Sequence, residues 1–152
     1  MTLTHRQQQF LDALLAKTRD LTLATLREDG YPQANTVNFA HDGATIYFCT
    51  SRESAKVRNL HASPRVAAAL HGDYEDLQGV RAVSLIGHAE VLADDGNESM
   101  RARELLARKF TQPWEVPAPQ DPSTTVFVRV VPLELTIIDY GLGYGHSERI
   151  AL

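Results

Sequence analysis

The chain has 152 residues, of which 43% are hydrophobic and 22% charged, and this length and composition suit one soluble domain with its own core. The formal net charge of −4 argues against a nucleic-acid-binding or anionic-membrane-binding surface, because such a surface needs a broad excess of positive charge. A single cysteine (Cys49), no apolar run of ~18 residues and no signal-peptide core predict a cytoplasmic protein without a disulfide or a membrane span.

The first third of the chain carries the pattern of one helix followed by strands. A capping box that begins at Thr4, with leucines on one face after it, predicts a helix from residue 4 to 18. Asp-Gly pairs at 29–30 and 42–43 predict tight hairpin turns. β-branched and aromatic residues flank these turns, so strands are expected over residues 21–26, 32–40 and 44–50.

The next segment is expected to contain a short helix. Ser51 or Ser54 can cap a helix that runs through Lys56 to about Ala62. Pro64 ends this helix, because the residue before a proline disfavours the helical region.

The rest of the chain adds further strands and one more helix. Strands are expected at 65–73, 81–94 and 124–140, and Pro132 in the last of them requires a sheet edge or a bulge. The segment from Glu98 to Lys109 has helical spacing, and residues 110–124 carry four prolines and predict an irregular loop.

These elements predict the fold class. The chain is expected to form one domain over residues 1–152, mainly β with short helices (α+β), built on a six-stranded antiparallel barrel that is closed or nearly closed. A parallel sheet is disfavoured, because most links between strands are too short for crossover helices.

A basic segment in an acidic chain is the main candidate for a functional site. The cations in it are Arg52, Lys56, Arg58 and Arg65, and the hydroxyls are Thr50, Ser51 and Ser54. A solvated helix face is the plain interpretation of such a charge run. Because the cluster lies where a strand ends and a helix begins, its free amides, hydroxyls and Lys56 also suit a single phosphate group.

The residues around this segment resemble a known family. D-G-x-P at residues 29–32, T-x3-S-x-K-x2-N-L-x3-P-R-V at residues 50–66 and IGHAEVL at residues 86–92 resemble the pyridoxamine 5′-phosphate oxidase-like superfamily of flavin-binding split barrels. The resemblance implies a split β-barrel homodimer with FMN bound in clefts between the two subunits. It implies phosphate contacts from Thr50 and Lys56. It also implies that Asn35, Thr36, Val37 and Asn38 lie along the flavin ring.

The sequence departs from the true oxidases of that superfamily. Asn35 and Ala40 stand where those enzymes have an arginine and a lysine, and Ala82 stands where they have a flavin-contacting glutamine. The C-terminal Trp-and-Arg substrate motif is absent. We therefore expect an FMN-dependent oxidoreductase of unknown substrate that is not a pyridoxamine phosphate oxidase. A reductase that uses the deazaflavin F420, a non-catalytic flavin-binding protein and a binder of another phosphorylated ligand remain open.

Other candidate residues are weaker. Cys49 lies in an apolar strand and is expected to be structural. The six histidines are scattered without a metal-binding motif, and no side chain has the marks of a catalytic acid or base. Trp114, Tyr144 and His146 either pack as ordinary loop and tail residues or cover the cofactor cleft, including that of a partner chain.

Overall fold

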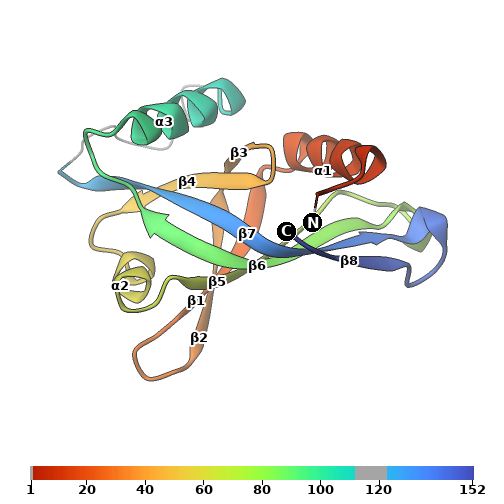
Figure 1. Cartoon of the computed structure of the whole chain (residues 1–152), viewed down its shortest axis with the longest axis horizontal. Helices are drawn as coiled ribbons and strands as arrows, with labels where there is room; N and C mark the ends of the chain where they lie inside the picture. The colour runs from red at the N-terminus through yellow and green to blue at the C-terminus, as the bar shows by residue number, and fades with distance from the viewer. Residues whose placement is uncertain (1, 112–122) are drawn as a thin grey trace.

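The computed structural model describes residues 2–111 and 123–152 of the chain (Figure 1). Within this part, the helices are α1 (His5–Lys17), α2 (Ala55–Ala62) and α3 (Asn97–Lys109), with short 3-10 turns η1 (Leu77–Gly79) and η2 (Tyr140–Leu142). The strands are β1 (Asp20–Leu26), β2 (Pro32–Asn38), β3 (Ala40–Asp42), β4 (Thr45–Ser51), β5 (Arg65–His71), β6 (Arg81–Val91), β7 (Thr125–Asp139) and β8 (Ser147–Ala151).

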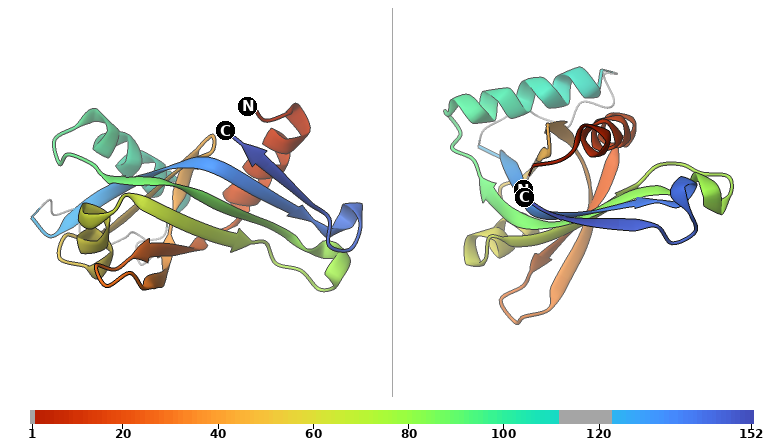
Figure 2. Two further views of the ribbon diagram at one scale, coloured as in Figure 1. Left: turned by 60° about the horizontal axis from the view of Figure 1, so that its bottom comes forward. Right: turned by 45° about the vertical axis from the view of Figure 1, so that its right-hand side comes forward.

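The strands form one antiparallel sheet that curls around its core (Figure 2). The strand order is β2-β1-β5-β6-β7-β4-β3, and β8 pairs with the last part of β7. The two ends of this order, β2 and β3, are consecutive in the chain with only Phe39 between them. The curled sheet therefore closes through a corner of the backbone, in agreement with the predicted barrel.

The predicted count of six strands is wrong for the described residues, which form eight. All six expected strands are present, but the expected second strand is divided into β2 and β3 at Phe39, whose amide donates to the carbonyl of Arg19 at 3.2 Å. β8 lies in the glycine-rich tail, where no strand was expected, because its place is fixed by pairing with the free edge of β7.

Pro132 lies at a bulge, as predicted. The β6–β7 pairing shifts between Ile86 and Gly87, so that Gly87 stands opposite Pro132. A side chain at Gly87 would overlap the carbonyl oxygen of Val131, so only glycine fits this close approach.

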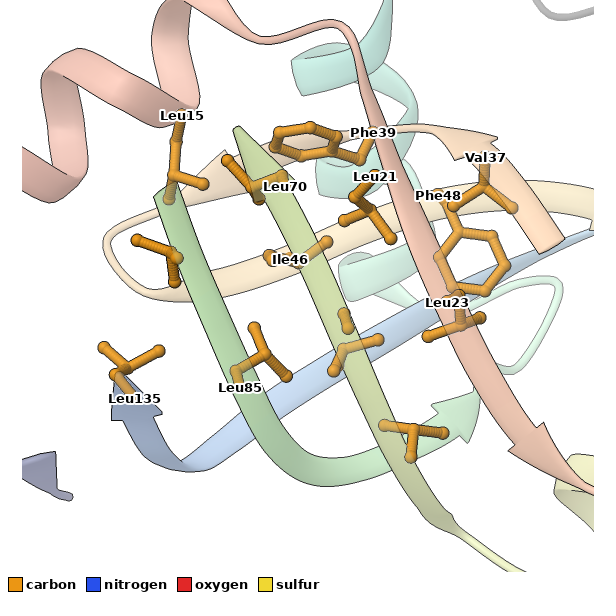
Figure 3. Packing of buried hydrophobic residues seen from close by; sticks show 14 of the residues in the cluster. Leu15, Leu21, Leu23, Val37, Phe39, Ile46, Phe48, Leu70, Leu85 and Leu135 are labelled. Atoms are coloured by element: carbon orange, nitrogen blue, oxygen red, sulfur yellow. The ribbon is translucent and has the colours of Figure 1, made fainter. Parts of the chain in front are cut away.

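The main core fills the inside of the curled sheet (Figure 3). Phe39 and Phe48 are fully buried there, and α1 closes one end with Leu11, Leu14 and Leu15. Because burial of apolar surface contributes roughly 25 cal/mol per Å², the burial of these side chains stabilises the packing of α1 against the barrel. None of the described helices is long and apolar enough to cross a membrane.

A smaller cluster lies between α3 and the outer side of β3, β4 and β7. Leu106, Phe110 and Phe127 are buried in it. Glu98 of α3 also accepts hydrogen bonds from Arg129 at 2.7 and 2.8 Å and from the Tyr47 hydroxyl at 3.1 Å. α3 is therefore held on the sheet by both apolar and charged contacts.

Candidate functional site

The candidate site lies where β4 ends and α2 begins. Ser54 is the N-cap of α2, and its hydroxyl oxygen accepts a hydrogen bond from the amide of Val57 at 3.3 Å. The Thr50 hydroxyl at the end of β4 donates to the same Ser54 oxygen at 3.3 Å. Because this oxygen already accepts twice, the Ser54 proton is free to donate to a ligand. Of the two predicted caps, Ser54 is confirmed, and Ser51 instead accepts from the Glu53 amide at 3.4 Å.

The first turn of α2 offers further donors. The amides of Ala55 and Lys56 precede the first intrahelical bond, which runs from the Arg58 amide to the Ser54 carbonyl, and no described residue accepts from them. Lys56 is half-buried in the same turn and forms no ion pair with a described residue. The first turn of α2 thus carries hydroxyl and amide donors and a lysine at the positive end of a helix dipole.

The other cations of the segment are held elsewhere. Arg52 forms a bidentate ion pair with Asp94, with both oxygens at 2.8 Å. Arg58 donates to the carbonyl of Glu53 at 2.9 Å. Arg65 lies on β5, opposite His88 of β6, and belongs to another surface. The predicted basic cluster is therefore divided, and only Lys56 remains at the junction without such a partner among the described residues.

A buried amide that the sequence analysis missed holds α2 in place. Asn59 is 6% exposed, and its side-chain amide donates to the Thr25 hydroxyl at 2.9 Å and to the Gln33 side chain at 3.0 Å. These bonds join α2 to both β1 and β2. The signal for this role was present, because Asn59 shares the buried side of α2 with Val57 and Leu60.

The predicted ring-contacting segment divides by strand alternation. Val37 is buried in the core, and Asn38 donates to Asp20, so both side chains are already engaged. Asn35 is half-buried on the same side of β2 as Gln33, which contacts α2. Thr36 points to the opposite face of β2 and lines a cleft there. Among the described residues, no hydrogen bond or ion pair joins this segment to Thr50 or Ser54, although β2 and β4 are neighbours in space.

Three adjoining clefts lie on the outer face of the sheet. A cleft of about 710 Å³ lies between α1 and the ends of β1 and β5, and its lining includes Thr36, His71 and Asp73. A second of about 510 Å³ includes Arg65 and His88, and a third of about 300 Å³ lies between them. The linings of these three clefts do not include Thr50, Ser51, Ser54 or Lys56, so the junction lies apart from them.

The remaining candidates are Cys49, Tyr144, His146 and Trp114. Burial raises the pKa of the Cys49 thiol, in keeping with a structural role. Tyr144 is 83% exposed and packs on Tyr140 at a ring distance of 5.4 Å, and His146 lies 3.7 Å from Glu148. Figure 1 places this turn at the opposite end of the molecule from α2. Trp114 lies outside the described residues.

Comparison with known proteins gives the same family as the motifs. The family model described as pyridoxamine 5′-phosphate oxidase matches residues 7–139. General stress protein 26 of Bacillus subtilis is 28% identical over 120 residues, which cover 79% of each chain. A solved F420 reductase is 28% identical with a TM-score of 0.65, covering 82% of this chain and 94% of that one.

The fold is shared more widely. A heme binding protein from Mycobacterium smegmatis superposes with a TM-score of 0.76 over 99% of this chain, at 23% identity, and the chain spans 59% of that protein's length. With the family model matched over most of the sequence, the chain belongs to the pyridoxamine 5′-phosphate oxidase-like superfamily.

Proposed function

We propose that this protein is a flavin-dependent oxidoreductase that binds FMN through its phosphate at the β4–α2 junction. The observation that carries the proposal is the set of unengaged donors there: the Ser54 hydroxyl, the amides of Ala55 and Lys56, and the Lys56 ammonium group. A phosphate dianion accepts several charge-assisted hydrogen bonds at once, so the donor set fits it. A neutral ligand would leave the positive charge of Lys56 without a negative charge to pair with.

The chain's own residues bind and orient the ligand. Thr50 fixes the Ser54 hydroxyl, and Asn59 fixes α2 against β1 and β2. Asn35 and Thr36 are the side chains of the second-strand segment that remain available to contact a ring system. When bound, the flavin supplies the hydride and electron chemistry. The protein then orients the ring and provides a surface that binds the substrate.

The deazaflavin F420 is the second candidate cofactor. The specific observation in its favour is the 28% identity to a solved F420 reductase over 82% of the chain. F420 also carries phosphate, so the same donors would serve. Heme is named for the M. smegmatis protein, but at 23% identity that likeness concerns the fold.

The test is to purify the protein and identify the ligand that it carries. An absorbance spectrum distinguishes flavin, deazaflavin and heme, and mass spectrometry of the released ligand gives its identity. We expect FMN, with bleaching by a reduced nicotinamide cofactor under anaerobic conditions and reoxidation by an acceptor. A flavin that no reduced nicotinamide bleaches, or a bleached flavin that no tested acceptor reoxidises, would favour a non-catalytic flavin-binding protein. A protein that neither carries nor takes up any flavin would refute the proposal.

A further inference from the structure

Two amide side chains lie on the core-facing side of β2. Strand alternation places Gln33, Asn35 and Val37 on one side of the strand, and Val37 is buried in the main core (Figure 3). Thr25, which pairs with Gln33 across the two strands, is also buried. A polar group on the core side of a strand is costly unless it has a hydrogen-bond partner. The partners of these two amides therefore need to be identified.

Asn59 fixes the orientation of the Gln33 amide. A primary amide has two N–H donors. Asn59 uses its nitrogen for two bonds, one to the Thr25 hydroxyl at 2.9 Å and one to the side-chain oxygen of Gln33 at 3.0 Å. Because the oxygen of Gln33 is directed at Asn59, the nitrogen of the same amide is directed elsewhere. No residue that the structure describes accepts a hydrogen bond from this nitrogen, so Gln33 presents an oriented, unused donor.

The Gln33 amide lies close to the proposed phosphate site. Lys56 and Asn59 are three residues apart on α2, so they are neighbours on the helix surface, with about 5–6 Å between their Cβ atoms. Gln33 is bonded directly to Asn59. The unused donor of Gln33 is therefore separated from Lys56 by one helical turn and one hydrogen bond. Asn35 follows Gln33 on the same side of β2, about 7 Å further along the strand.

We propose that Gln33 donates a hydrogen bond from its side-chain nitrogen to a carbonyl oxygen of the flavin ring and selects for rings that carry such an acceptor. The pyrimidine part of the flavin ring has two carbonyl oxygens, which accept hydrogen bonds. Because Asn59 already holds the Gln33 side chain, the contact loses little conformational entropy when the ligand binds. This contact concerns the ring at the site of the proposed function, and it rests on that function.

The contact also has a consequence for the reduction potential of the bound flavin. Hydrogen bonds and charges close to the ring tune its electronic properties. Reduction places more negative charge on the pyrimidine part of the ring. A donor at this position therefore favours the reduced flavin, whereas a carboxylate at the same position favours the oxidised flavin. A residue with a purely structural role in β2 would not change the potential in this way.

Gln33→Glu tests the contact and keeps the bond to α2. The carboxylate can still accept the hydrogen bond from Asn59, but it has no N–H donor and carries a negative charge. FMN, riboflavin and lumiflavin, which lacks the ribityl chain, are titrated into apoprotein with flavin fluorescence as the signal. We expect Gln33→Glu to bind all three flavins at least about ten-fold more weakly, and the midpoint potential of bound FMN to become more negative.

Two further variants control the experiment. Gln9→Glu adds the same charge at an exposed position of α1, which Figure 1 places away from α2, and should change neither affinity nor potential. Gln33→Met removes the donor without adding a charge and should weaken all three flavins about two- to ten-fold. Denaturant titration verifies that each variant is folded. Unchanged binding of lumiflavin by both Gln33 variants, or a potential that does not become more negative in Gln33→Glu, would overturn the proposal.

Lys56→Ala, measured with the same three flavins, separates this inference from the proposed function. A loss of FMN affinity in Lys56→Ala, with no effect of Gln33→Glu on any flavin, would refute the ring contact and leave the phosphate site standing. Weaker binding of all three flavins by Gln33→Glu, with FMN unaffected in Lys56→Ala, would refute the phosphate site and support the ring contact. A wild type that binds none of the three flavins would refute both.

Discussion

At the scale of single residues, the four cations between Arg52 and Arg65 differ in what surrounds them. Asp94 neutralises Arg52, and the Glu53 carbonyl holds Arg58. Exposed pairs of this kind contribute roughly 0–1 kcal/mol to stability, but they decide which charge is available to a ligand. Lys56 is therefore the cation that we connect with function.

Asn59 holds α2 against β1 and β2, and its replacement tests that role. Asn59→Ala removes two hydrogen bonds and leaves the buried Thr25 hydroxyl, 1% exposed, without this partner. We expect the free energy of unfolding to fall by about 1–3 kcal/mol in denaturant titrations. Asn97→Ala, at an exposed position in α3, should change it by less than about 0.5 kcal/mol. Equal losses for the two variants would contradict the role of Asn59.

At the scale of elements, Lys109 connects two helices that are far apart in sequence. Its ammonium group, at the end of α3, donates to the carbonyls of Leu15 and Thr18 at 3.0 and 2.6 Å. It also lies 3.8 Å from the centre of the Phe39 ring. Lys109 thus satisfies carbonyls at the end of α1 that would otherwise lack partners.

This contact predicts a stability that depends on pH. Burial, with a smaller effect of Arg19, lowers the pKa of Lys109 from 10.5 to about 8. Because the unfolded chain holds this proton more tightly, folding gains stability as the pH rises from about 8 towards 10.5 and loses it again as the pH falls back towards 8. Lys109→Met should lower the free energy of unfolding, by a margin that grows between pH 8 and 10. Lys17→Met, at an exposed lysine, is the control, and a margin for Lys109→Met that is constant with pH would contradict the assignment.

The elements also show what local sequence can and cannot predict. Alternation, Asp-Gly turns and caps were enough to locate α1, α2, α3 and six strands, because each of these signals lies within a few residues. β3 and β8 were missed because a backbone corner at Phe39 and the free edge of β7 create them. In the same way, the sequence could group Thr50, Ser54 and Lys56, because they lie close together in the chain. It could not predict the ion pair of Arg52, because Asp94 lies 42 residues away.

At the scale of the whole molecule, the prediction about the substrate concerns vitamin B6. Asn35 and Ala40 stand where the true oxidases have an arginine and a lysine, so these two positions supply no cation to hold pyridoxamine phosphate. We expect a kcat/KM for its oxidation below about 10⁴ M⁻¹s⁻¹, the lower end of the usual enzyme range. A true oxidase assayed in parallel provides the reference, and a value within that range would show the prediction wrong.

The central claim is that the β4–α2 junction receives a flavin phosphate, and a paired titration tests it most directly. FMN and riboflavin are titrated into apoprotein of the wild type, Lys56→Ala and Arg58→Ala, with flavin fluorescence as the signal. Loss of one charge-assisted hydrogen bond costs roughly 1.5–3 kcal/mol, so Lys56→Ala should bind FMN about ten- to hundred-fold more weakly. Its affinity for riboflavin, which has no phosphate, should change little, and Arg58→Ala should resemble the wild type. Equal losses for both flavins, or no loss for FMN, would contradict the claim.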